Sequence, residues 1–130
     1  MNLGETFGFV TQDQVEAMSM GDRIGVLNKS VLVQVGTPQE IYSNPVNTFV
    51  ARAVGSPAMK LLPGLMAGGQ AVLGDGLALD HPDGAEGHSL IFGVRPEDVE
   101  LAPGAPIAAV MTDVENHDDE KIVSLTAGTY

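Results

Sequence analysis

Four side chains between residues 81 and 88 are of the types that bind divalent metals: His81, Asp83, Glu86 and His88. Histidine nitrogens and carboxylate oxygens are common zinc ligands. The stretch, HPDGAEGH, has no helical spacing that would place these side chains on one face, and its proline and glycines indicate a turn. We expect a turn here and no metal site, and keep a metal-dependent enzyme as a distant alternative.

A second polar cluster consists of four consecutive residues, His117, Asp118, Asp119 and Glu120. It directly precedes the apolar run KIVSL, which is typical of a β-strand. A solvated hairpin turn is therefore favoured over a binding site. Nothing in the order or spacing of the Ser, His and Asp residues singles out a nucleophilic triad.

Arg95 stands next to Pro96, Glu97 and Asp98, directly after the apolar run SLIFGV. An arginine beside two acids at the end of a buried strand can fix a turn through charge-assisted hydrogen bonds. The same three charged side chains can instead contact a partner domain. The structural role is favoured, and a partner contact stays open.

Composition excludes several classes of function. The chain has 130 residues, 17 acidic against 6 basic, and a formal net charge of −11, so it would repel nucleic-acid phosphates and anionic lipid headgroups. It has no cysteine, and therefore no disulfide framework or thiolate chemistry. The beginning, MNLGETFG, is unlike a signal peptide, and no apolar run is long enough to span a membrane. We expect a cytoplasmic protein that neither binds nucleic acid nor inserts into a membrane.

The elements that would position these residues begin with residues 6–11, TFGFVT. This run is rich in β-formers and apolar at Phe7, Phe9 and Val10, which predicts a buried strand. Two pairs of residues then have the spacing of a helix cap: Thr11 with Gln14, and Asp13 with Glu16. Val15 and Met18 share one face of the helix that follows, and core packing is their expected role.

The next elements predicted are a hairpin and two short helices. Residues 22–28, DRIGVLN, and residues 31–37, VLVQVGT, have the pattern of two strands, although no glycine stands in the turn around Asn28, Lys29 and Ser30. Pro38 can start the helix PQEIYSN. Pro45 ends that helix or starts the next one, PVNTFVARAV.

From Gly55 onward glycine and proline separate short apolar runs, which predicts a small antiparallel β domain. The runs are QAVL, LAL, SLIFGV, IAAVM and KIVSL. We place the boundary near Gly55 to Pro57, which gives domains 1–55 and 56–130. The predicted fold class is α+β.

Three stretches in this order carry a specific family resemblance: VTQDQVEAMSMGDRIGVLN, QVGTPQEIYSNPVNTFVARAVGSPAMKLLPG and FGVRPEDVEL. Together, over roughly residues 3 to 101, they resemble the ATP-binding subunit of ABC importers of the maltose or glycerol-phosphate type. The resemblance implies that residues 1–55 are the end of the nucleotide-binding domain, with its switch loop. It implies that residues 56–130 are part of an OB-like regulatory domain of the TOBE kind, a partial barrel with open edges.

Subunits of this family hold ATP and magnesium with a glycine-rich loop, GxxxxGK[ST], whose backbone N–H groups cradle the phosphates. No such motif occurs in the chain. At the nearest match, around Lys29 and Ser30, Asn28 replaces the second glycine and Arg23 the first. The signature motif, the magnesium-binding aspartate and the glutamine loop would lie before residue 1. We expect no enzyme activity and no bound cofactor for this chain alone.

The resemblance also implies a change at the switch loop, where the family has histidine in VTHDQ and this chain has Gln12. That histidine contacts the γ-phosphate. A glutamine amide can donate a hydrogen bond but carries no charge near neutral pH. Gln12 is therefore the candidate catalytic position, expected to be inactive.

The function expected from the resemblance is that of a non-catalytic, regulatory part of an importer subunit for a carbohydrate or related solute. In the family such subunits lie at the inner face of the membrane and work with transmembrane permease subunits. The alternative is a stand-alone β module that binds a partner or small ligand. Because the strand of Phe7 to Val10 would lack neighbours, we also expect a homo-oligomer. Its interface would use the face of Phe7, Phe9, Val26 and Val33, or the strands around Ile91 and Val94.

Overall fold

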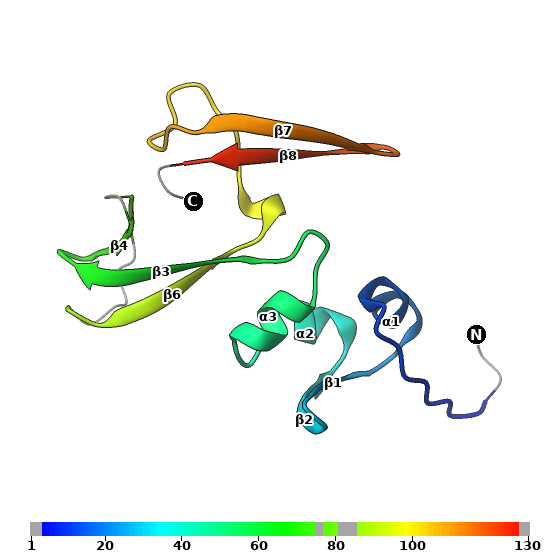
Figure 1. The fold of residues 1–130 in the computed structure, drawn as a ribbon. Helices are drawn as coiled ribbons and strands as arrows, with labels where there is room; N and C mark the ends of the chain where they lie inside the picture. Colours follow the sequence, from blue (N-terminus) through cyan, green and yellow to red (C-terminus); the bar gives the residue numbers. More distant parts are fainter. Residues whose placement is uncertain (1–3, 75–76, 81–85, 128–130) are drawn as a thin grey trace. The chain divides into compact units, whose positions relative to one another are not determined.

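The computed structural model describes residues 4–74, 77–80 and 86–127. The chain separates into two compact units, of which the first ends at Met59 and the second begins at Lys60, a few residues after the predicted boundary. The first unit holds three short helices and a hairpin, and the second consists of antiparallel strands (Figure 1). The α+β class predicted from the sequence is confirmed.

Helix α1 (Gln14–Met20) is capped by the second of the two predicted pairs. The Asp13 carboxylate accepts a hydrogen bond from the Glu16 backbone N–H at 3.1 Å. Met18 packs against the core of the unit as predicted. Val15 is 63% exposed, so the prediction of a core role was wrong for this residue. A helix of this length turns only a narrow stripe toward its neighbours.

Strands β1 (Ile24–Asn28) and β2 (Val31–Gly36) form the predicted antiparallel hairpin. Both residues of its turn have positive φ, 47° at Lys29 and 65° at Ser30. This is the backbone of a type I′ turn, whose twist matches that of the strands. The turn therefore forms without the glycine that usually occupies it.

Helices α2 (Pro38–Ser43) and α3 (Thr48–Ala53) follow the hairpin. Thr37 and Glu40 form a complete capping box on α2, and Asn47 caps α3 by accepting from the Val50 N–H at 2.9 Å. Consequently Pro45 precedes α3 without belonging to it. The core of the unit is made by Ile41, Val50 and Val54, with partly buried side chains around them: Met18, Ile24, Val26, Val33 and Tyr42.

One expectation for this unit was wrong. The run Thr6–Thr11 forms no strand, and Phe7, Phe9 and Val10 are 64%, 50% and 90% exposed. An apolar β-rich run pairs only where a neighbouring strand is present, and none pairs with it in the described part of the chain. Val26 and Val33 are partly buried against the unit's own core, and the oligomer interface stays a prediction.

The second unit contains a four-stranded antiparallel sheet with strand order β5-β4-β3-β6. Its strands are β3 (Lys60–Ala67), β4 (Gln70–Leu73), β5 (Ala78–Asp80) and β6 (Ser89–Val94). Three of the predicted runs lie in these strands, but β3 was not predicted, because Pro63 and Gly64 interrupt it. Pro63 is tolerated because the ladder to β4 starts only at Gly64, so Pro63 has a neighbouring strand on one side alone.

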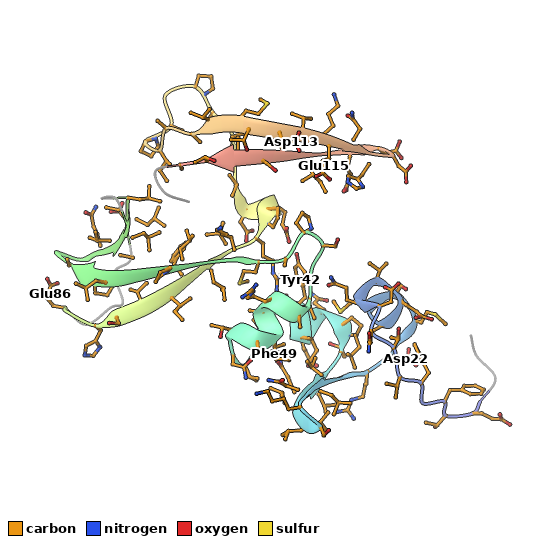
Figure 2. The ribbon with its side chains drawn as sticks, in the orientation of Figure 1. Asp22, Tyr42, Phe49, Glu86, Asp113 and Glu115 are labelled. Carbon is orange, nitrogen blue, oxygen red and sulfur yellow. The ribbon has the colours of Figure 1, made fainter. Side chains whose placement is uncertain are left out.

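A separate antiparallel hairpin, β7 (Val110–His117) and β8 (Glu120–Thr126), ends the described chain. Residues 107–109 of the predicted run IAAVM lie outside β7. The pairs Met111 with Leu125 and Val114 with Val123 place four apolar side chains on one face of this hairpin. The opposite face carries Asp113, Glu115 and His117, and Figure 2 labels the first two on β7.

Candidate functional site

The sharpest candidate site is the turn after β6. Arg95 lies at the end of that strand and is 5% exposed, the one charged or polar residue that is buried among the described residues. A short 3-10 helix, Pro96–Asp98, follows it. The Arg95 carbonyl accepts from the Asp98 N–H at 3.0 Å, and the Pro96 carbonyl accepts from the Val99 N–H at 3.2 Å.

Arg95 is shielded from solvent, unlike the two acids of the turn that follows it. Burial lowers the pKa of Arg95, because the protein interior solvates the charged form poorly, and the Asp98 carboxylate opposes that shift. Glu97 and Asp98 are themselves exposed. A partner that meets this turn would therefore reach the two carboxylates and not the guanidinium.

The switch-loop position is placed directly before α1. Gln12 is exposed, on a loop where the Thr11 hydroxyl accepts from the Asp13 N–H at 2.9 Å and donates to Glu16 at 2.8 Å. Next to it is a shallow groove lined by Gln14, Val15, Met18, Ser19, Tyr42, Gly55 and Ser56. The residues that line this groove include no charged side chain.

The nearest match to a phosphate loop is a β-turn. Lys29 and Ser30 occupy the two turn positions between β1 and β2, and both are exposed. A phosphate loop instead leads into a helix whose first N–H groups point at the phosphates. Lys29 and Ser30 instead connect two strands.

The structure describes only two of the four potential metal ligands in the first cluster, Glu86 and His88. His81 and Asp83 lie outside the described residues. The carboxylate of Glu86 accepts from the Gly68 N–H through both oxygens, at 3.1 and 3.0 Å, and so fixes the turn between β3 and β4. This contact could not be predicted from the sequence, because the pairing of β3 with β6 brings the two residues together.

The second cluster is a solvated hairpin turn, as predicted. Asp118 has a φ of 44°, and the residues of the turn are exposed. His117 Nε2 lies 3.2 Å from Glu115 Oε2 across the strand surface. In the parts of the chain that the structure describes, no three His, Asp or Glu side chains gather as a metal site. Within the same parts, no helix has the length and apolarity to cross a membrane.

The four-stranded sheet of the second unit lies in a segment that matches a known protein family. Residues 55–99, which include β3 to β6 and the Arg95 turn, match the family described as the MalK OB fold domain. OB folds are five-stranded, partly open barrels, and this segment supplies a four-stranded antiparallel sheet.

Curated relatives match far more of the chain. The trehalose/maltose import ATP-binding protein of Thermococcus litoralis is 44% identical over 97% of this chain. Glycerol-3-phosphate import ATP-binding proteins of Jannaschia and Salmonella typhimurium are 42% and 45% identical over 93% and 75% of it. The chain spans 38%, 35% and 29% of the lengths of these three relatives. The resemblance seen in the sequence is confirmed, and the chain is related to the ATP-binding subunits of sugar and glycerol-phosphate importers, corresponding to their C-terminal region with its OB fold domain.

Proposed function

We propose that this chain acts as the non-catalytic, regulatory C-terminal part of an ATP-binding subunit that drives import of a carbohydrate or related solute. The observation that carries the proposal is the extent of the match. Relatives named as import ATP-binding proteins are 44% and 42% identical over nearly the whole chain. The matched region includes the OB fold segment at residues 55–99.

The lack of activity that we propose for the chain alone is inferred from its residues. ATP and magnesium would be held by a phosphate loop that this sequence does not contain, and Lys29 and Ser30 stand in a hairpin turn instead. Gln12 replaces the histidine of the switch loop, and its amide cannot take up a charge near neutral pH. Nucleotide chemistry would thus belong to the remainder of a complete subunit.

The partners proposed are the transmembrane permease subunits of such an importer, which would hold the assembly at the cytoplasmic face of the membrane. The exposed carboxylates of Glu97 and Asp98 are the candidate contacts between domains or with a partner. Buried Arg95 would position their turn.

A chimera tests the proposal. This chain would replace the matched segment of the Thermococcus trehalose/maltose ATP-binding protein, and the product would be assembled with its transporter. We expect assembly with weak ATP hydrolysis, because Gln12 occupies the switch position, and recovery of hydrolysis in the Gln12→His chimera. The matched control is Gln14→His, which places the same side chain two residues further along the chain. Failure of both chimeras to assemble would refute the proposal.

A stand-alone β module is the second candidate. It is favoured by the second unit's own buried side chains, Leu62, Met66, Ala71 and Leu73, which come from β3 and β4. If the chimeras fail and the isolated chain is a monomer that melts cooperatively at every concentration, this function becomes the better supported one.

A further inference from the structure

The groove beside α1 in the first unit is lined by uncharged residues. It has a volume of about 380 Å³, within the range of about 300 to 1,000 Å³ that is usual for small-molecule sites. The residues come from α1, from α2 and from the chain that follows α3: Gln14, Val15, Met18, Ser19, Tyr42, Gly55 and Ser56. Three separate segments of the chain thus meet around one opening.

One part of the groove is apolar. Met18 and Tyr42 are partly buried against the core around Ile41, so the packing of the unit holds them in place. Figure 2 labels Tyr42 among the side chains of this unit. Val15 lies on α1 with Met18 and is largely exposed. The groove therefore presents an apolar and partly aromatic surface to a molecule that enters it.

The other part of the groove offers hydrogen bonds without charge. The Gln14 amide can both donate and accept, and so can the Ser56 hydroxyl. The Ser19 hydroxyl donates its proton to the Glu16 carbonyl at 3.2 Å, which leaves its oxygen to accept from a ligand. A ligand that fits this groove would therefore combine an apolar face with groups that both donate and accept.

A sugar in its ring form has this combination, because C–H groups point to the faces of the ring and hydroxyl groups surround its edge. An ionised phosphate fits less well, since it would lose water without gaining a cationic partner among the lining residues. The formal net charge of −11 adds repulsion of any anion. The groove thus favours an uncharged sugar over a phosphorylated one.

We propose that this groove binds an uncharged carbohydrate from solution. The inference rests on the proposed function, in which the chain belongs to an importer of a carbohydrate or related solute. A bound sugar would touch α1, whose first turn is tied to the loop of Gln12. There the Thr11 hydroxyl donates to the Glu16 carboxylate at 2.8 Å, and the Asp13 carboxylate accepts from the Glu16 N–H at 3.1 Å. Imported solute would then be sensed next to the switch-loop position.

The experiment titrates the full, isotopically labelled chain with maltose, an uncharged disaccharide, and follows the backbone amide signals by NMR. We expect saturable shifts at residues 14–19 and 55–56. A shallow groove with few hydrogen bonds should give a Kd of about 1 mM. Glycerol 3-phosphate is the charged comparison and should cause no saturable shift at these residues.

Two variants test the hydrogen-bonding part of the groove. Gln14→Ala and Ser56→Ala should each weaken maltose binding about fivefold, because each removes one uncharged hydrogen bond. The matched controls are Gln39→Ala and Ser43→Ala, which remove the same side chains from exposed positions of α2 outside the groove. These controls should leave the Kd unchanged, and circular dichroism should show the same folding in all four variants.

The inference would be overturned if maltose caused no saturable shift, or shifted only other parts of the chain. Equal weakening by the controls and the groove variants would also overturn it. Saturable binding of glycerol 3-phosphate at the same residues would reject the choice of an uncharged ligand. Assembly of the chimera needs no added sugar, so an assembled chimera without maltose binding would reject this inference alone. Maltose binding by a chain whose chimeras fail to assemble would reject the proposed function alone.

Discussion

Replacing Gly64 with alanine should destabilise the second unit. Gly64 lies in β3 opposite Leu73 of β4 and Leu90 of β6. A Cβ at this position would stand 2.6 Å from Leu73 Cδ2, 3.0 Å from the Val72 carbonyl oxygen and 3.4 Å from Leu90 Cδ1. Carbon atoms in contact are ordinarily about 3.5 to 4.0 Å apart, so the sheet must open or Leu73 must leave its rotamer.

The size of the effect follows from the surroundings of Leu73. This side chain is 2% exposed and cannot turn into solvent to make room. Overpacking of a core costs about 1 to 3 kcal/mol. Alanine recovers about 0.4 to 1 kcal/mol by restricting the unfolded chain. We expect a net loss of about 1 kcal/mol, which lowers the Tm of a domain of this size by about 4 to 8 °C.

Thermal and urea unfolding followed by circular dichroism would measure the loss. Gly8→Ala is the matched control, because a Cβ there meets no atom within 4 Å and the φ of Gly8 is not positive. In the background of Leu73→Val, which removes the clashing Cδ2, Gly64→Ala should cost less, so the double-mutant cycle should show coupling. A Gly64→Ala chain as stable as Gly8→Ala would refute the reasoning.

Three further predictions concern the first unit and the isolated chain. Hydrogen bonds with Thr37, first from its backbone N–H and then with its side chain, lower the pKa of Glu40 below its ordinary 4.5. The ionised Glu40 carboxylate therefore stabilises the folded state fully above pH 4.5, and this contribution is lost as the pH falls through the lowered pKa. Melting curves across that pH range should show less acid sensitivity in Glu40→Gln than in the unchanged chain. Calorimetry with Mg-ATP should show no saturable binding to the isolated chain, because the phosphate loop is missing. For the same reason Gln12→His should produce no ATP turnover. Micromolar binding of Mg-ATP, or turnover above a protein-free control, would contradict this prediction. Light scattering across a dilution series should show self-association through the exposed Phe7 and Phe9 side chains, and a compact monomer at every concentration would count against it.

Local signals in the sequence predicted the local structure well. The cap of α1 at Asp13, the β1–β2 hairpin around Lys29 and Ser30, and the start of α2 at Pro38 all depend on contacts between residues a few positions apart. Such contacts are encoded by short motifs, and a motif is fully visible in the chain. The order of the three family-like stretches likewise predicted the relationship that the comparisons confirm.

Predictions that depended on distant neighbours failed or were missed. The apolar run at Phe7 to Val10 indicated a buried strand, but burial needs a partner, and the run is exposed. The strand β3 escaped prediction because Pro63 and Gly64 normally interrupt strands. Whether Pro63 is tolerated depends on which side of β3 has a neighbour, and that is a property of the assembled sheet.

The sequence by itself determined the chemistry available at the candidate site: an arginine beside two acids after an apolar strand, and a glutamine in place of a histidine at residue 12. Only the tertiary structure decided that Arg95 is buried while Glu97 and Asp98 face solvent, and that Glu86 closes the turn at Gly68. Charge and hydrogen-bonding capacity belong to each residue. Burial and partnership are set by side chains and backbone groups brought together across the sheet from distant parts of the chain.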